Sequence, residues 1–316
     1  MKRVVTSGEL TQRAMRPADL LDAYLAHVQA DVTRFDLLRG GRERGCPACG
    51  GEGAFDCERL GFSYKRCLSC QSMFVSPLPD PDRLARYHTE GDAERFRREK
   101  VLPMTADVRT RHAEAPRARW ALAAAAARLG SGLTFAQMGV DSPQLHELLS
   151  VSASVVRSSE EAIDGYADAS ADCVIAFDLL ERSTDFSRTL HRCRAALRQA
   201  GLLFVATMSG DGFEVRMLGA HTRSLVPPVH LQLLSYAGWL AALAREDFTL
   251  VEYSTPGELD VQAVAEVCRR DAGLRLPPIL DELVRHDDDQ VGRAFQEVLQ
   301  QACLSAHVQL VAEAGA

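Results

Sequence analysis

The feature that most constrains this chain is a pair of CxxC motifs near its N-terminus. The string "CPACG" supplies Cys46 and Cys49, and "CLSCQ" supplies Cys67 and Cys70. In a CxxC turn two thiolates converge on one metal ion, so two such turns complete a tetrahedral four-cysteine site, for which Zn²⁺ is the expected occupant. Because four thiolates leave no position open for a catalytic water, we expect this zinc to be structural.

The remaining cysteines do not fit this pattern. We interpret Cys57, close to the motifs, as a spare thiol, and four others are scattered along the chain: Cys173, Cys193, Cys268 and Cys303. An odd count in a chain whose N-terminus shows no export signal does not suggest a disulfide framework. The alternative for the two motifs is free thiols or a redox pair.

Composition narrows the class of protein. The 316 residues are 47% hydrophobic and 25% charged, which is typical of a globular chain. The net charge of −7 argues against non-specific electrostatic binding of nucleic acid. No apolar run approaches 18 residues, and no signal peptide follows the first basic residues. We therefore expect a cytoplasmic protein without membrane association, whose partner is another protein or a small molecule.

From Leu133 onward, short apolar runs alternate with helical patterns. This alternation predicts a mostly parallel sheet in a Rossmann-like α/β layer structure. The predicted strands are 133–139, 153–157, 172–177, 201–207 and 248–254, and the predicted helices are 143–150, 185–198 and 235–245.

Five segments follow along the chain. We predict an N-terminal helical arm (1–41), a zinc ribbon with a hairpin between its two cysteine pairs (42–79), a helical linker or cap (80–130), the α/β domain (131–256) and a helical extension (257–316) with a possible last strand in "HVQLVAE".

Several long strings resemble a family of zinc-ribbon class I S-adenosylmethionine (SAM)-dependent methyltransferases. The strings are "RPADLLDAYL", "MFVSPLPDPDRLARYH", "ADCVIAFDLLER", "ALRQAGLLFVATMSGDGF", "GAHTRSLVPPVHLQLLS", "YSTPGELDV" and "FQEVLQQACLSAHVQLVAE". The resemblance covers nearly the whole chain and implies the Rossmann-like class I methyltransferase fold. If a donor is bound, it implies contacts at Gly139 and Asp178.

The methyl-donor motif of that family is altered here. The family pattern is roughly D-x-G-x-G-x-G, and this chain places Gln137 at the acidic position, keeps Gly139, and has Asp141 and Pro143 at the next two glycines. Asp141 adds a side chain and a charge where the backbone must approach the donor, and Pro143 removes an N–H. We expect these changes to impair SAM binding.

The chain between the first and fourth strands of the family pattern is also short. Residues 140–171 must hold two helices and two strands in the usual fold, which needs roughly 45–50 residues. One βα unit therefore does not fit. Since residues 153–157 resemble the third strand, we expect the second to be missing. Glu160 or Glu161 would have to replace its carboxylate, unless both simply lie in a solvated loop.

The half that faces the acceptor substrate in the resembling enzymes is better matched. It retains Asp211, Gly212, His221, the proline pair at 227–228 and His230. A neutral imidazole at His230 could act as a general base, or it could shape its loop through backbone hydrogen bonds. His221 and Asp211 are further catalytic candidates.

Two functions compete. The first is a methyltransferase-like pseudoenzyme that has lost SAM binding and acts as a substrate-binding or scaffold subunit with a partner enzyme in a biosynthetic pathway. The alternative is an active group-transfer enzyme, either a divergent SAM-dependent methyltransferase or one that uses another donor of the adenine-nucleotide type.

Overall fold

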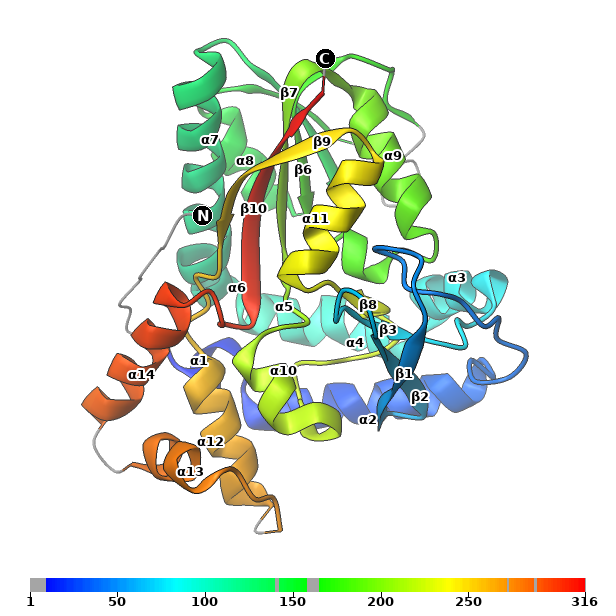
Figure 1. Cartoon of the computed structure of the whole chain (residues 1–316), viewed down its shortest axis with the longest axis vertical. Helices are drawn as coiled ribbons and strands as arrows, with labels where there is room; N and C mark the ends of the chain where they lie inside the picture. Colours follow the sequence, from blue (N-terminus) through cyan, green and yellow to red (C-terminus); the bar gives the residue numbers. More distant parts are fainter. Residues whose placement is uncertain (1–9, 140–141, 158–164, 272, 287–288, 316) are drawn as a thin grey trace.

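A central six-stranded sheet organises the part of the chain that the computed structural model describes, residues 10–139, 142–157, 165–271, 273–286 and 289–315 (Figure 1). Its order is β5-β4-β6-β7-β10-β9, in which the first four strands are parallel and β10 runs antiparallel between β7 and β9. The strands are β4 (Thr134–Gly139), β5 (Ser154–Arg157), β6 (Ala171–Phe177), β7 (Leu197–Met208), β9 (Phe248–Ser254) and β10 (His307–Ala314). This is the Rossmann-like class I methyltransferase fold that the sequence predicts.

Helices cover both faces of the sheet because its strands alternate their side chains (Figure 1). In β6, Cys173 and Ile175 pack in the core beneath α7 (Ala115–Leu129) and α8 (Pro143–Ser150). Val174 and Ala176 face the opposite core, under α9 (Phe186–Ala196) and α11 (Tyr236–Arg245). The predicted strands and helices of this domain are confirmed to within a few residues.

The shortened edge of the sheet differs from our expectation in one respect. β5 pairs directly with β4 in parallel register, Ser154 opposite Thr134, and α8 provides the crossover between them. A single right-handed crossover lays the next strand beside the first, so β5 occupies the second position rather than the third. The assignment of residues 153–157 to a third strand, with the second missing, is thereby corrected. Glu160 and Glu161 lie outside the described residues.

The cysteine-rich segment forms the predicted hairpin and continues into the α/β part. β1 (Gly53–Arg59), β2 (Phe62–Cys67) and β3 (Met73–Val75) are joined by β8 (Gln232–Leu233), which pairs antiparallel with β3. Three of the four motif cysteines, Cys46, Cys67 and Cys70, share a buried core with Trp239 of α11. The ribbon is therefore built into the wall of the molecule.

Helices from the N-terminal half, most of them short, lie across the carboxyl ends of the parallel strands (Figure 1). They are α1 (Gln12–Met15), α2 (Ala18–Arg34), α3 (Pro81–Glu90), α4 (Asp92–Phe96), η1 (Arg97–Val101), α5 (Leu102–Met104), α6 (Ala106–Arg109) and η2 (Thr110–Glu114). Pro103 and Pro116 occupy first-turn positions of α5 and α7, where a missing N–H is tolerated. η1 and η2 are π-helical turns, a local widening that often lies at functional sites.

The remaining elements extend this end of the molecule. η4 (Leu180–Arg182) follows β6, and α10 (Phe213–Leu218) and η5 (Gly219–His221) follow β7. The C-terminal extension contains α12 (Asp260–Arg270), α13 (Pro278–Arg285) and α14 (Asp289–Gln301) before β10. Within the described residues we find no helix with the length and apolar character needed to cross a bilayer.

Candidate functional site

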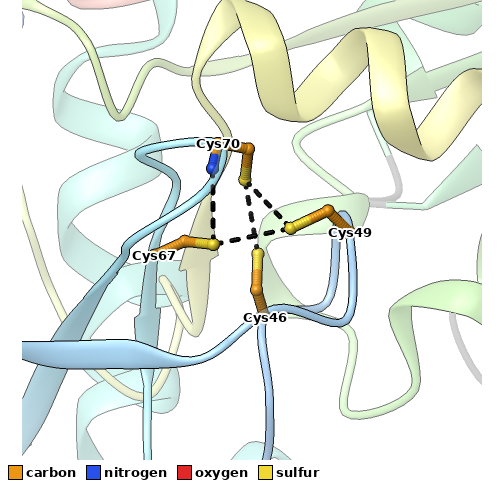
Figure 2. A group of neighbouring side chains, drawn as sticks. All are labelled: Cys46, Cys49, Cys67 and Cys70. Atoms are coloured by element: carbon orange, nitrogen blue, oxygen red, sulfur yellow. Dashed lines mark hydrogen bonds between the residues drawn. The ribbon is translucent and has the colours of Figure 1, made fainter.

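The four cysteines of the two CxxC motifs converge on one point (Figure 2). The Sγ atoms of Cys46 and Cys70 lie 3.6 Å apart, and Cys49 Sγ lies 3.4 Å from Cys67 Sγ and 3.5 Å from Cys70 Sγ. A tetrahedral zinc with Zn–S bonds of about 2.3 Å would place its sulfurs about 3.8 Å apart. None of the nine cysteines, all of which lie in the described residues, forms a disulfide. The cluster thus has the ligand type, number and spacing of a zinc site.

Backbone N–H groups support the charge that such a site requires. Burial raises the pKa of Cys67, but the N–H groups of Cys70 and Ser69 and the neighbouring thiols outweigh it and lower that pKa to about 7. A thiolate is the form that ligates metal. The cluster is also tied to the α/β part, since the Ser235 hydroxyl at the start of α11 donates to the Cys70 carbonyl.

The space at the carboxyl end of β4, where the family motif would hold the methyl donor, is small. We call it the donor crevice: it measures about 40 Å³ and is bordered by Gln137, Ser142 and Asp178. Ligand pockets usually measure about 300–1,000 Å³. Gln137 is buried, and Gly139 has a φ of +104°, with the Leu179 Cβ only 3.0 Å from where its own Cβ would stand. The glycine therefore serves close strand-end packing.

Side chains from α7 and η2 fill the donor crevice. Arg117 donates to Asp178 Oδ2 at 2.8 Å, and Ser142 Oγ donates to Glu114 Oε1 at 3.0 Å. Burial alone would raise the pKa of Asp178, but Arg117 and Arg109 hold it below its usual value. Asp178 is thus an ionised carboxylate whose nearest cation already comes from the protein.

A second space, about 430 Å³, lies between the N-terminal helices and the carboxyl ends of the strands. We call it the arginine cavity, because seven arginines line it against four carboxylates, in a chain whose net charge is −7. Apolar side chains such as Leu20, Leu21 and Val226 complete the wall. Its size and mixed lining match those of a site for a small organic molecule.

Two neutral imidazoles lie on the arginine cavity. His230 Nδ1 accepts the Val226 N–H at 2.9 Å, and burial, with help from the Arg182 charge, lowers the His230 pKa to about 4. Burial and the charge of Arg16 lower the pKa of His307, the first residue of β10, to about 3. Both side chains are therefore uncharged at pH 7 and are available to a ligand as hydrogen-bonding groups.

The structure brings only some of the predicted site residues together. His230 and Asp178 line the arginine cavity, whereas Gly139 lies at the donor crevice end of β4. Asp211 accepts the Tyr236 N–H at 2.8 Å and pairs with Arg216, so it caps the start of α11 outside the cavity wall. His221 lies 3.5 Å from Asp271, half exposed and also outside that wall.

The cavity arginines and His307 were not among the predicted site residues. Arg16, Arg97 and Arg109 come from three separate helical segments, and Arg223 comes from the loop after η5. Arg97, Arg109, Arg111 and Arg117 fall in the segment predicted as a helical linker or cap (80–130). Arg16, Arg182 and Arg223 lie outside it, and no motif marks any of the seven as a site residue. His307 begins the last strand, where alternation alone marks it as part of the sheet.

Comparison with known proteins gives fold-level likeness only. No family model and no curated protein matches this chain. Solved structures that resemble it include a SAM-dependent methyltransferase from Archaeoglobus fulgidus, at 12% identity over 74% of this chain and 100% of that one, with a TM-score of 0.42.

Two further structures are similar. One is the complex of the Haloferax volcanii Trm112 methyltransferase activator with a chain assigned as a methyltransferase, at 14% identity over 69% of this chain and 98% of that one, TM-score 0.43. The other is a SAM-dependent methyltransferase from Mesorhizobium loti, at 13% identity over 62% of this chain and 97% of that one, with a TM-score of 0.36. At these values the functional argument rests on the chain's own site.

Proposed function

We propose that this protein is a methyltransferase-fold pseudoenzyme that does not bind SAM in the donor crevice and binds a small molecule in the arginine cavity. It would act as a substrate-binding or scaffold subunit beside a partner enzyme in a biosynthetic pathway. We also propose that Cys46, Cys49, Cys67 and Cys70 hold a structural zinc, which fixes one wall of the molecule.

The observation that carries the proposal is the difference in volume between the donor crevice and the arginine cavity, which both lie at the carboxyl ends of the strands. The donor crevice offers about 40 Å³, and the paired side chains of Arg117 and Asp178 occupy its mouth. A sulfonium nucleoside needs a pocket of the usual several hundred cubic ångströms. Gln137 at the acidic position and Pro143 at a glycine position remove further contacts that the family motif supplies.

Thermal unfolding with a ligand panel tests this proposal. A ligand at 100 times its dissociation constant adds about 2.7 kcal/mol to the free energy of unfolding. We expect no shift with SAM or S-adenosylhomocysteine. A clear shift with these two ligands would refute the proposal. The panel should include adenosine diphosphate and adenosine triphosphate, because they address the alternative function.

The alternative is a group-transfer enzyme with a different donor, and one observation favours it. The arginine cavity reaches Asp178 at the carboxyl end of β6, the edge at which doubly wound sheets bind their ligands. A neutral His230 on the same wall is in the protonation state of a general base. A thermal shift with adenine nucleotides, and none with SAM, would favour this alternative.

A further inference from the structure

Several guanidinium groups of the arginine cavity form no ion pair with the described residues, and Arg109 is the first of them. Arg109, the last residue of α6, lines the cavity, and within the described residues no hydrogen bond or ion pair engages its guanidinium. Burial lowers the pKa of Arg109 and the charge of nearby Arg117 acts in the same direction, while the charges of Asp178 and Glu114 act against them. Arg109 is half-buried, and a guanidinium partly withdrawn from water without a hydrogen-bonded anion is a cost to the fold that a bound anion would offset.

The neighbouring arginines are arranged differently. Arg117 is held by Asp178 at 2.8 Å, and Arg97 by Glu94 at 2.9 Å. Asp178 and Glu94 therefore each pair with another arginine, whereas Asp178 and Glu114 act on Arg109 through their charge only, without a described hydrogen bond or ion pair.

A second cation lies on an adjacent element. Arg16 follows α1, which contacts α6, and the only described hydrogen bond of its guanidinium is a long one of 3.3 Å to the Gln12 amide oxygen. Arg111, in η2, adds an exposed cation on the same wall, again without a described ion pair. Three guanidinium groups thus remain for a ligand.

We propose that the arginine cavity binds a small molecule through a phosphate or diphosphate group, with Arg109 as the central contact and Arg16 and Arg111 beside it. This inference rests on the proposed substrate-binding role of the cavity and names the class of compound. An excess of three arginines over carboxylates matches a group of two or three negative charges better than a single carboxylate.

The shape of the cavity limits the rest of the ligand. At about 430 Å³, it admits a small organic molecule rather than a polymer, and its apolar wall, including Val101 and Leu102, favours a largely uncharged body. The neutral His230 and His307 offer hydrogen bonds without adding charge.

Calorimetric titration of the full-length, zinc-loaded protein tests the inference with three probes: inorganic pyrophosphate, phenyl phosphate and citrate. We expect saturable one-to-one binding of both phosphate probes, and weaker binding of citrate. Arg109→Gln should weaken phosphate binding by about tenfold to a hundredfold, because it removes a charge-assisted hydrogen bond. The matched control Arg119→Gln changes an exposed arginine on α7 outside the cavity and should bind as the wild type does.

Two further measurements test whether Arg109→Gln loses binding only because it is misfolded. Without ligand, Arg109→Gln should unfold at the same temperature as the wild type or a higher one, since it removes an unpaired charge. Arg109→Lys keeps the charge but loses the planar fork, so its affinity should lie between those of the wild type and Arg109→Gln. Equal weakening by Arg109→Gln and Arg119→Gln would overturn the inference, as would citrate binding as tightly as pyrophosphate.

The same preparation titrated with S-adenosylhomocysteine separates this inference from the proposed function. If both the phosphate probes and S-adenosylhomocysteine bind, the proposed loss of SAM binding is refuted and the phosphate site is supported. If neither phosphate probe binds and S-adenosylhomocysteine gives no heat of binding, the phosphate inference fails and the proposed loss of SAM binding stands. If only S-adenosylhomocysteine binds, both fail.

Discussion

The donor crevice and the arginine cavity lie at the same edge of one sheet, and they differ about tenfold in volume: about 40 Å³ against about 430 Å³. Asp178, Arg109 and Arg117 border both spaces. Arg117 neutralises the Asp178 carboxylate, and on the crevice side Ser142 and Glu114 close the rim. On the cavity side charges of one sign are in excess and space remains. A fold can thus fill one ligand site with its own side chains while its neighbour stays open.

The largest effect should come from the metal site, because the ribbon holds one wall of the arginine cavity. The Tyr64 hydroxyl, on β2, donates to the His230 carbonyl, and the Val75 N–H, on β3, donates to the Leu231 carbonyl. Cys46→Ser should release the zinc and lower the free energy of unfolding by several kcal/mol, since binding energy at a structural site is folding energy. Metal analysis and thermal unfolding measure this.

Cys57→Ser is the matched control for the metal site. Cys57 lies on β1, half-buried, outside the four-sulfur cluster. This variant should keep one zinc per chain and nearly wild-type stability. Wild-type protein purified without zinc, or equal metal loss in the two variants, would contradict the assignment.

The next largest effect is a pH dependence of stability that arises from Glu181, in the η4 turn after β6. It reports on whether water reaches the carboxyl ends of the strands. Burial, together with the charge of Asp178, raises the pKa of Glu181 to about 7. Because the native pKa exceeds the unfolded one, this group's contribution to stability is lost as pH rises from about 4.5 through 7, amounting to about 3 kcal/mol. Glu181→Gln should remove that loss.

The measurement is the free energy of unfolding of the wild type and Glu181→Gln between pH 5 and 8. His230 and His307 act oppositely: their lowered pKa values mean that stability is lost as pH falls below about 6.5. They remain in both proteins, so the difference between the two curves isolates Glu181. Glu147→Gln, at an exposed position on α8, should follow the wild type. Parallel curves for the wild type and Glu181→Gln would mean that water reaches this edge.

The smallest effect should come from opening the donor crevice. Arg117→Ala removes the ion pair with Asp178 and should lower the free energy of unfolding by about 1–2 kcal/mol. We expect it to remain unable to bind S-adenosylhomocysteine, since Gln137 and the shortened edge persist. Arg119→Ala, on the exposed side of the same helix, is the control. Micromolar binding by Arg117→Ala would mean that one side chain alone closes the crevice.

Much of the fold could be predicted because it depends on local patterns. Short apolar runs located β4, β6 and β9, and the spacing of the cysteines located the ribbon. The two-residue strand β8 could not be predicted, because its partner, Met73–Phe74, lies far away in the sequence and two residues show no periodicity. The position of β5 was misassigned because similarity to a strand does not specify its neighbour, whereas pairing does.

The open site was harder to predict than the filled one. The residues of the family's donor motif are close together in the sequence, so the substitutions at Gln137 and Pro143 can be recognised without a structure. The arginine cavity is assembled from Arg16, Arg109 and Arg223, which only tertiary packing brings to one wall. Whether a guanidinium is paired depends on that packing, and a sequence pattern carries no information about it.

The central claim is that the donor crevice does not hold the methyl donor. Calorimetric titration of the zinc-loaded, full-length protein with S-adenosylhomocysteine tests it most directly. We expect no saturable heat of binding at ligand concentrations up to the millimolar range. A one-to-one isotherm with micromolar affinity that Asp178→Ala abolishes would contradict it.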